Sequence, residues 1–91
     1  MNGGLWRNHH GRTGASQADV LLSMLRHARA NGRAVQLPEI MGAGIAQHGA
    51  RFNELRRRGF DIENEIKRDA HGRVLSRYWL QHDPELDGGT E

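Results

Sequence analysis

The sequence predicts a small α+β domain, because its apolar residues follow two different periods in two successive parts of the chain. Between residues 16 and 58 they recur every three or four positions, as on one face of a helix. After Gly59, apolar and polar residues alternate, first over 60–66 and again over 74–80. Helices followed by a block of strands are typical of an α+β fold with an antiparallel sheet.

A chain of 91 residues is long enough for one domain, which we place at residues 16–82. Residues 1–15 are rich in Gly, Asn, His and Arg without a hydrophobic period, and they predict a flexible basic tail. The last nine residues read DPELDGGTE, and we expect an acidic disordered tail over residues 83–91.

The first helix is expected to begin near Ser16, whose hydroxyl can accept from an unpaired N–H of the first turn. Asn31-Gly32 predicts its end, and Arg26, His27 and Arg29 place cations near its C-terminus. Its apolar face consists of Val20, Leu21, Met24, Leu25 and Ala28.

A short strand is expected over residues 34–37, followed by a short helix that starts at Pro38. Gly42-Ala43-Gly44 interrupts the helical pattern, and a third helix is expected over 45–58. Two helices joined by a tight glycine turn form a helix-turn-helix arrangement. Gly59 is expected to end the third helix in the left-handed conformation.

The alternating runs after Gly59 predict a β-hairpin whose loop covers residues 67–73 and contains Gly72. Tyr78 and Trp79 are neighbours in an alternating run, so one of the two rings is expected to face away from the core.

This order of elements is that of a winged helix-turn-helix, with three helices, a short strand and a C-terminal hairpin as the wing. The run GIAQHGARFNELRRRGFDI, followed by a hairpin that ends in SRYWL, resembles a small winged-helix DNA-binding family of phage and bacterial proteins. The resemblance covers residues 17–80, with Phe52 where the family more often has isoleucine. It implies a phage or prophage-type regulator of transcription or recombination in the bacterial or host cytoplasm. The matching positions are Ala50, Arg51, Phe52, Leu55, Arg56, Gly59, Phe60 and Ile62.

The charge distribution agrees with a polyanionic partner such as double-stranded DNA. The formal net charge is +2, but the acidic tail carries four of the 11 acidic residues and no base. Residues 1–82 therefore hold 13 basic and 7 acidic residues, a net charge of +6. Many small basic domains bind no polyanion, so the charge alone does not identify the partner.

We expect the helix over 45–58 to lie in a DNA major groove. Gln47 and Arg51 are the best candidates for base edges, since glutamine pairs with adenine and arginine with guanine. Ala50 is small enough to contact a thymine methyl group, and Asn53 lies off the centre of this face. Arg57 and Arg58 are expected at phosphates, although cations at this helix end are also favourable without a ligand.

Two other residues of this helix have different expected roles. Glu54 opposes DNA binding unless it accepts from cytosine N4 or pairs with a neighbouring arginine. Arg56 is expected to be structural, with its methylene groups over the core and its guanidinium at a strand end.

The hairpin loop is expected to lie along the DNA backbone, or in a minor groove, through Lys67, Arg68, His71 and Arg73. A basic loop tip also occurs for solubility alone. Arginines of the N-terminal tail are expected to add minor-groove contacts.

The alternative to DNA binding is a non-catalytic protein-protein interaction module. In that case Trp79, Trp6 and the acidic tail would form or regulate the interface. A further hypothesis is that the acids over 83–91 fold back on the arginines and compete with DNA. The oligomeric state is left open: a homodimer would suit the reading of paired half-sites in DNA, but no heptad or dimer helix is present.

Other classes of function are not indicated. There is no cysteine, no paired histidine spacing for a metal, no nucleophile elbow and no phosphate-binding loop. We therefore expect no enzyme activity, cofactor, metal or small-molecule substrate. No stretch approaches the roughly 20 apolar residues of a membrane helix, and the N-terminus lacks the apolar centre of a signal peptide, so we expect a cytoplasmic protein without a membrane partner.

Overall fold

The computed structural model describes residues 14–88 and is an α+β domain with three helices and a three-stranded antiparallel sheet. This confirms the predicted class and the predicted order of elements. The N-terminal tail lies outside the described residues, apart from Gly14 and Ala15, which belong to the first helix. The elements are α2 (Gly14–Ala30), β1 (Val35–Gln36), α3 (Leu37–Gly42), α4 (His48–Arg57), β2 (Asp61–Arg68) and β3 (Val74–His82).

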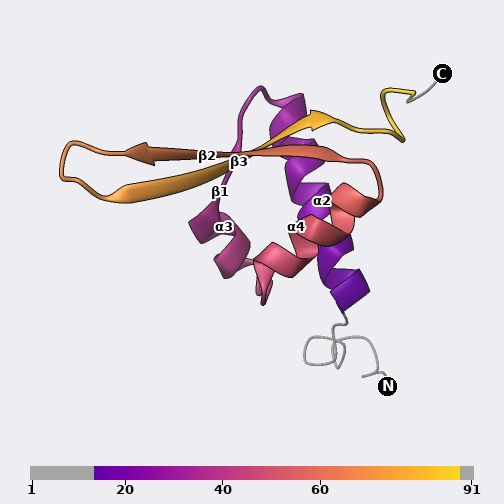
Figure 1. Cartoon of the computed structure of the whole chain (residues 1–91), viewed down its shortest axis with the longest axis horizontal. Coiled ribbons are helices and arrows are strands. Elements are labelled where there is room, and N and C mark those ends of the chain that lie inside the picture. The colour runs from indigo at the N-terminus through magenta and orange to yellow at the C-terminus, as the bar shows by residue number, and fades with distance from the viewer. Residues whose placement is uncertain (1–13, 89–91) are drawn as a thin grey trace.

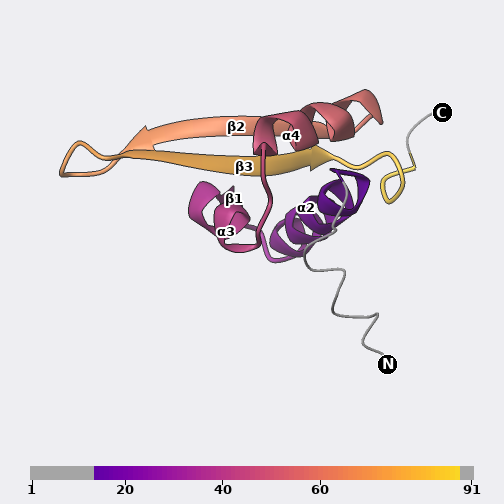
Figure 2. The same cartoon turned by 90° about the horizontal axis from the view of Figure 1, so that it is seen from below.

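The strands β2 and β3 form a long hairpin that extends well beyond the helices (Figure 1). The view from below shows α2 and α3 on one side of the hairpin, with α4 running beside β2 (Figure 2). The sheet order is β1-β3-β2, so β3 is the central strand. β1 pairs with only two residues of β3, Val35 opposite Tyr78 and Gln36 opposite Arg77.

The core lies where α2, α4 and the inner half of the hairpin meet. Phe52 of α4 stacks on Tyr78 of β3, with ring centroids 4.1 Å apart and planes 19° from parallel. Such a pair contributes about 0.5–1.5 kcal/mol beyond the burial of its apolar area. The buried cluster around it is formed mainly by Leu21, Leu22, Leu25, Val35, Ile40, Ile45, Leu55, Phe60, Ile62 and Leu80.

Helix α4 begins at His48, three residues later than predicted. The reason is the turn that ends α3, in which Gly44 has φ +79° and the Ile45 N–H donates to the Ile40 carbonyl at 3.4 Å. This is the Schellman pattern, which places the apolar residue after the glycine back against the helix. Ile45 is accordingly buried, and the chain turns through Gln47, which has φ +51°, before α4 starts.

At the other end of α4, Gly59 has φ +100°, as expected for a left-handed cap. Its N–H donates to the Arg56 carbonyl at 3.0 Å, and the N–H of Phe60 donates to the Leu55 carbonyl at 3.2 Å. This Schellman cap ends the helix and directs the chain into β2.

The hairpin is longer than predicted and its loop is shorter, because Lys67 and Arg68 belong to β2 and β3 continues to His82. The loop is closed by Asp69, whose Oδ1 accepts from the N–H groups of His71 at 2.8 Å and Arg73 at 2.9 Å. The carboxylate satisfies the turn backbone, so the strands can pair up to its edge.

The alternation in the hairpin buries side chains only where helices lie beneath it. Ile62, Tyr78 and Leu80 are buried, whereas Ile66 and Val74, which share their face, are exposed. Alternation of this kind is typical of a strand with one buried face, but here it corresponds to burial only in the inner half, because the hairpin extends past the helical layer.

Residues 83–88 differ from the expected disordered tail, because they pack against α2 and are part of the described structure. Asp83 is fully buried and lies against Arg26, 57 residues earlier in the chain. Charged residues are rarely buried without an ionic or hydrogen-bonding partner, and Arg26 is such a partner for Asp83.

Candidate nucleic-acid interface

The exposed face of α4 carries Gly49, Asn53 and Arg57, with Gln47 at its start. Asn53 and Arg57 point away from Phe52 and Leu55, which are buried in the core, whereas Gly49 lies at the edge of this face. Ala50 is half-buried at the edge of the face. Within residues 14–88, the side chain of Arg57 has neither a hydrogen-bonding nor an ionic partner, so this cation is available to a ligand.

Arg51 is less available than predicted, because it is half-buried and paired along the helix. Its Nη1 lies 3.2 Å from Glu54 Oε1, and its side chain is 17% exposed. The Nε of Arg51 is buried without a hydrogen-bonding partner among the described residues. The pair neutralises Glu54, which removes the charge that opposed DNA binding, but it also occupies the arginine proposed for guanine.

The three successive arginines at the end of α4 have three different surroundings. Arg56 donates from Nη2 to the Ile62 carbonyl at 3.0 Å and lies over the Phe52 ring, which agrees with its predicted structural role. Arg57 points outward. Arg58 lies over the Phe60 ring and 3.9 and 3.8 Å from carboxylate oxygens of Asp19 and Glu85, so it is partly compensated.

The outer half of the hairpin displays a second group of cations. Lys67 and Arg73 are exposed, and Arg68 donates to the Gly72 carbonyl at 3.2 Å. His71 lies exposed at the loop. The acid of this loop, Asp69, is occupied by the turn backbone and lies 3.8 Å from Arg73. The tip is therefore positively charged and accessible.

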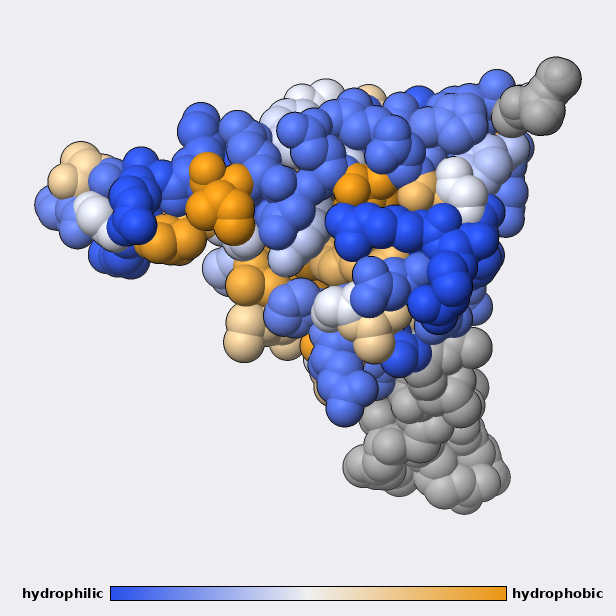
Figure 3. Space-filling view, in the orientation of Figure 1, coloured by the Kyte–Doolittle hydropathy of each residue, from blue (hydrophilic) through white to orange (hydrophobic). Residues whose placement is uncertain are grey.

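On the face seen in Figure 3, strongly hydrophilic surface covers α4, and a second hydrophilic area lies at the end of the hairpin. Apolar patches interrupt the hydrophilic surface of the hairpin between these two areas (Figure 3). The α4 residues and the basic hairpin residues proposed for DNA thus lie at two ends of the molecule, with apolar patches on the hairpin between them.

The C-terminal segment forms a clasp of three carboxylates, Asp83, Glu85 and Asp87, on the end of α2. Arg26 donates from Nε to Asp83 Oδ2 at 2.6 Å and from Nη2 to Asp83 Oδ1 at 3.0 Å, and Nη2 also donates to Glu85 Oε1 at 2.9 Å. Arg29 makes a second bidentate pair, with Asp87, at 3.0 and 2.7 Å. The sequence led us to expect these acids to fold back on arginines, but it did not indicate Arg26 and Arg29 of α2 as the partners, because they lie more than 50 residues away.

These contacts shift the titration of the clasp. The hydrogen bonds from Arg26 hold the pKa of Asp83 below its usual value, against the opposing effect of burial. The hydrogen bonds from Arg29 lower the pKa of Asp87 to about 2. Both groups are therefore ionised at neutral pH, and the two arginines of α2 are already neutralised within the domain.

The outward-facing ring of the hairpin is Trp79, since Tyr78 lies in the core. Its Nε1 donates to Glu65 Oε1 at 2.8 Å, and Arg77 donates to the same oxygen at 2.6 Å while lying over the indole ring. The hydrogen bond from Trp79, followed by that from Arg77, lowers the pKa of Glu65. Trp79 is half-buried, and its indole N–H already has a hydrogen-bonding partner on the neighbouring strand. Both facts weaken the hypothesis that Trp79 forms a surface for a protein partner.

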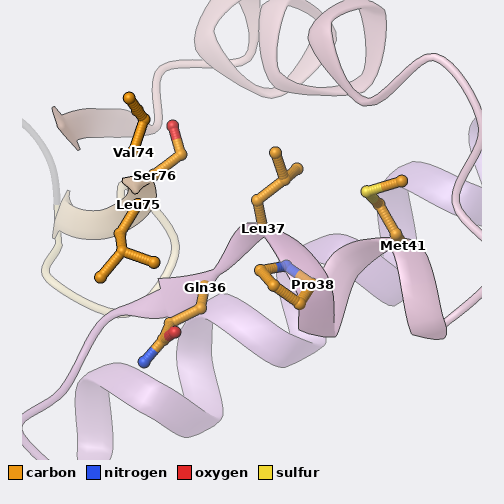
Figure 4. Close-up of a pocket in the computed structure, with 7 residues that line it drawn as sticks. All are labelled: Gln36, Leu37, Pro38, Met41, Val74, Leu75 and Ser76. Carbon is orange, nitrogen blue, oxygen red and sulfur yellow. The ribbon is translucent and has the colours of Figure 1, made fainter. Parts of the chain in front are cut away.

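A groove that the sequence did not predict lies between α3 and the start of β3 (Figure 4). It has a volume of about 290 Å³ and a mostly apolar lining. We call it the α3–β3 groove; it is lined by Gln36, Leu37, Pro38, Met41, Val74, Leu75 and Ser76.

No group of three or more His, Cys, Asp or Glu side chains within residues 14–88 is arranged to hold a metal ion. No helix in the same range has the length and apolar character needed to cross a bilayer. Comparison of the chain with protein-family models, curated proteins and solved structures yields no match.

Proposed function

We propose that the chain is a winged helix-turn-helix protein that binds double-stranded DNA, with α4 in the major groove and the hairpin on the backbone. Helices α3 and α4, joined by the turn at Gly44, correspond to the helix-turn-helix, and β2 with β3 corresponds to the wing. The observation that supports this best is the exposed, polar face of α4 together with a long hairpin that carries cations at its free end.

The exposed face of α4 suits DNA in its chemistry. Asn53 and Gln47 are amides that can pair with N6 and N7 of adenine, and Gly49 beside them allows a close approach of the helix. Arg57 has no competing carboxylate in the described part of the chain and suits a phosphate or a guanine edge. Arg51 would have to exchange Glu54 for a base, so we rank it below Asn53 and Gln47 as a reader of sequence.

The hairpin contributes affinity and not sequence specificity in this proposal. Lys67, Arg68 and Arg73 are the cations nearest its free end, and each phosphate that they neutralise releases counterions. Binding should therefore weaken steeply with salt. Control of transcription or recombination in a phage or bacterial setting is the role implied by the resemblance to small winged-helix regulators.

Fluorescence anisotropy with a labelled mixed-sequence duplex at low and at higher salt tests the proposal. Arg57→Ala, and separately Arg68→Ala with Arg73→Ala, should weaken binding several-fold at low salt. The salt slope should fall by about 0.9 for each phosphate that a variant no longer neutralises. Arg33→Ala is the matched control for Arg57→Ala, because Arg33 lies in the loop between α2 and β1 and its removal also takes away one positive charge.

Equal effects of Arg33→Ala and Arg57→Ala would mean that only net charge attracts the DNA, and the α4 assignment would fail. Absence of binding at low salt would reject DNA as the partner. Protein-protein interaction is the second candidate function, and the α3–β3 groove is the observation that favours it.

A further inference from the structure

The outer half of the hairpin and the adjoining helix α3 expose four large apolar side chains. Met41 is 62% exposed, Ile66 60%, Val74 55% and Leu75 37%. Val74 lies diagonally across the strand pair from Ile66, and the α3–β3 groove joins it to Leu37 and Met41 (Figure 4). A contiguous apolar patch with a polar border marks a binding surface in a soluble protein.

The backbone beside this patch lacks a strand partner. β1 pairs with β3 only at Arg77 and Tyr78, because the chain turns into α3 at Leu37. In the described structure, residues 74–76 of β3 therefore pair with β2 on one side and with no strand on the other. An open strand edge offers regularly spaced N–H and C=O groups to an added extended segment.

The charges around the open edge are mainly positive. Arg68 is the cross-strand partner of Val74, and Lys67 is the partner of Leu75, while Arg73 precedes Val74 in the chain. Two acids lie close to this part of the hairpin: Asp69 is bound to the turn backbone, and Glu65 is paired with Arg77. On the α3 side, Glu39 lies 3.6 Å from Arg33, which compensates it. An occupant with acidic residues would complement this border.

We propose that the α3–β3 groove binds an extended acidic peptide segment of a partner protein, which adds a short strand to the open edge of β3 and inserts an apolar side chain between Met41 and Val74. The volume of about 290 Å³ is at the lower end of the roughly 300–1,000 Å³ of small-molecule pockets, and it suits one or two side chains. DNA is a poor occupant, because phosphates would lose water against apolar walls without gaining hydrogen bonds. The proposal is independent of DNA binding.

The test is selection of short random peptides by display on the full-length chain, followed by titration of the isotope-labelled chain with the selected peptide. We expect selected sequences in which apolar residues alternate with Asp and Glu. Backbone amide shifts should concentrate on Val74, Leu75 and Ser76 and on α3. Met41→Glu and Leu75→Glu should each weaken peptide binding at least ten-fold, since a carboxylate would then border the apolar site.

Leu86→Glu is the matched control, because Leu86 is 64% exposed and lies outside the groove. It should leave peptide binding unchanged, and unfolding curves of all three variants should match the parent chain, since the replaced side chains are exposed.

Three results would overturn the proposal. One is a selection that enriches no sequence, or enriches basic ones. Another is equal binding by the Met41→Glu variant. The last is a groove that is already occupied in the absence of peptide. Amide shifts that depend on protein concentration and that Met41→Glu abolishes would identify a second copy of the chain as the occupant. Amide shifts of residues 1–13 that Met41→Glu abolishes but that do not depend on protein concentration would identify the N-terminal segment. Because the peptide titration contains no DNA, failure here is distinct from failure of the DNA proposal.

Discussion

Replacing Asp83 by alanine should destabilise the domain by about 3 kcal/mol. The Asp83 carboxylate is fully buried and accepts four hydrogen bonds, two from Arg26 and two from the backbone N–H groups of Glu85 and Leu86. Removing one partner of a fully buried ion pair costs about 3–5 kcal/mol. We take the lower end because the Arg26 side chain is 29% exposed and retains Glu85 as a partner.

An effect of this size is a large share of the total stability. Domains are stabilised by about 0.05–0.15 kcal/mol per residue, which for this chain of 91 residues is on the order of 5–14 kcal/mol. For a domain of this size, each 1 kcal/mol lowers the Tm by about 4–8 °C. A loss of about 3 kcal/mol should therefore lower the Tm of the Asp83→Ala variant by at least about 12 °C relative to the parent chain.

Urea unfolding at neutral pH, followed by circular dichroism, measures the difference in the free energy of unfolding from the midpoint and the slope. The control is Glu85→Ala, because Glu85 binds the same guanidinium but its side chain is 57% exposed. A surface ion pair of this kind contributes about 0–1 kcal/mol. If Asp83→Ala unfolds at the same urea concentration as Glu85→Ala, burial of the clasp is not what stabilises residues 83–88.

Three further predictions concern acid stability, the cap of α4 and the outer face of the hairpin. The folded-state pKa of Asp87 is lowered to about 2. The contribution of Asp87 to stability is therefore complete above its ordinary pKa and is lost as the pH falls toward 2. A urea midpoint that is constant between about pH 5 and pH 2 would contradict this prediction. Gly59→Ala should destabilise the domain by about 1–3 kcal/mol, because residue 59 has φ +100° and the new Cβ would lie 3.3 Å from Cγ of Pro84. The control is Gly49→Ala in α4, where the new Cβ meets open space. It should be neutral or slightly stabilising in the same unfolding assay. Trp79→Phe removes a hydrogen bond to Glu65 and should raise the pKa of that carboxyl toward its ordinary value in a carboxyl NMR titration; an unchanged pKa would assign the shift to the neighbouring arginine alone.

Local features of the chain were predicted well because they depend on residues close together in sequence. Gly59 ends α4 as expected, since a left-handed cap is decided within one helical turn. Arg56 reaches the start of β2, only six residues later. The change of period at Gly59 correctly located the hairpin, although not the exact ends of its strands.

The candidate site was predicted less well, because side-chain availability depends on distant neighbours. The helical period placed Arg51 on the outward face, but in the folded domain it is half-buried and paired with Glu54. Arg58 was expected to be free for phosphate, yet Asp19 and Glu85 lie within 4 Å of it. Of the arginines proposed for α4, Arg57 has no such partner within residues 14–88.

The sequence by itself determined the class of the domain, the order of its elements and the presence of a basic hairpin, because these depend on local periodicity and on turn residues. The tertiary structure decided that Asp83 is buried against Arg26, that Ile66 and Val74 are exposed, and that an apolar groove borders an open strand edge. The physical reason is the same in each case. Burial depends on which elements come to lie over a segment, and the alternation of residues within a strand contains no information about where the covering layer of helices ends.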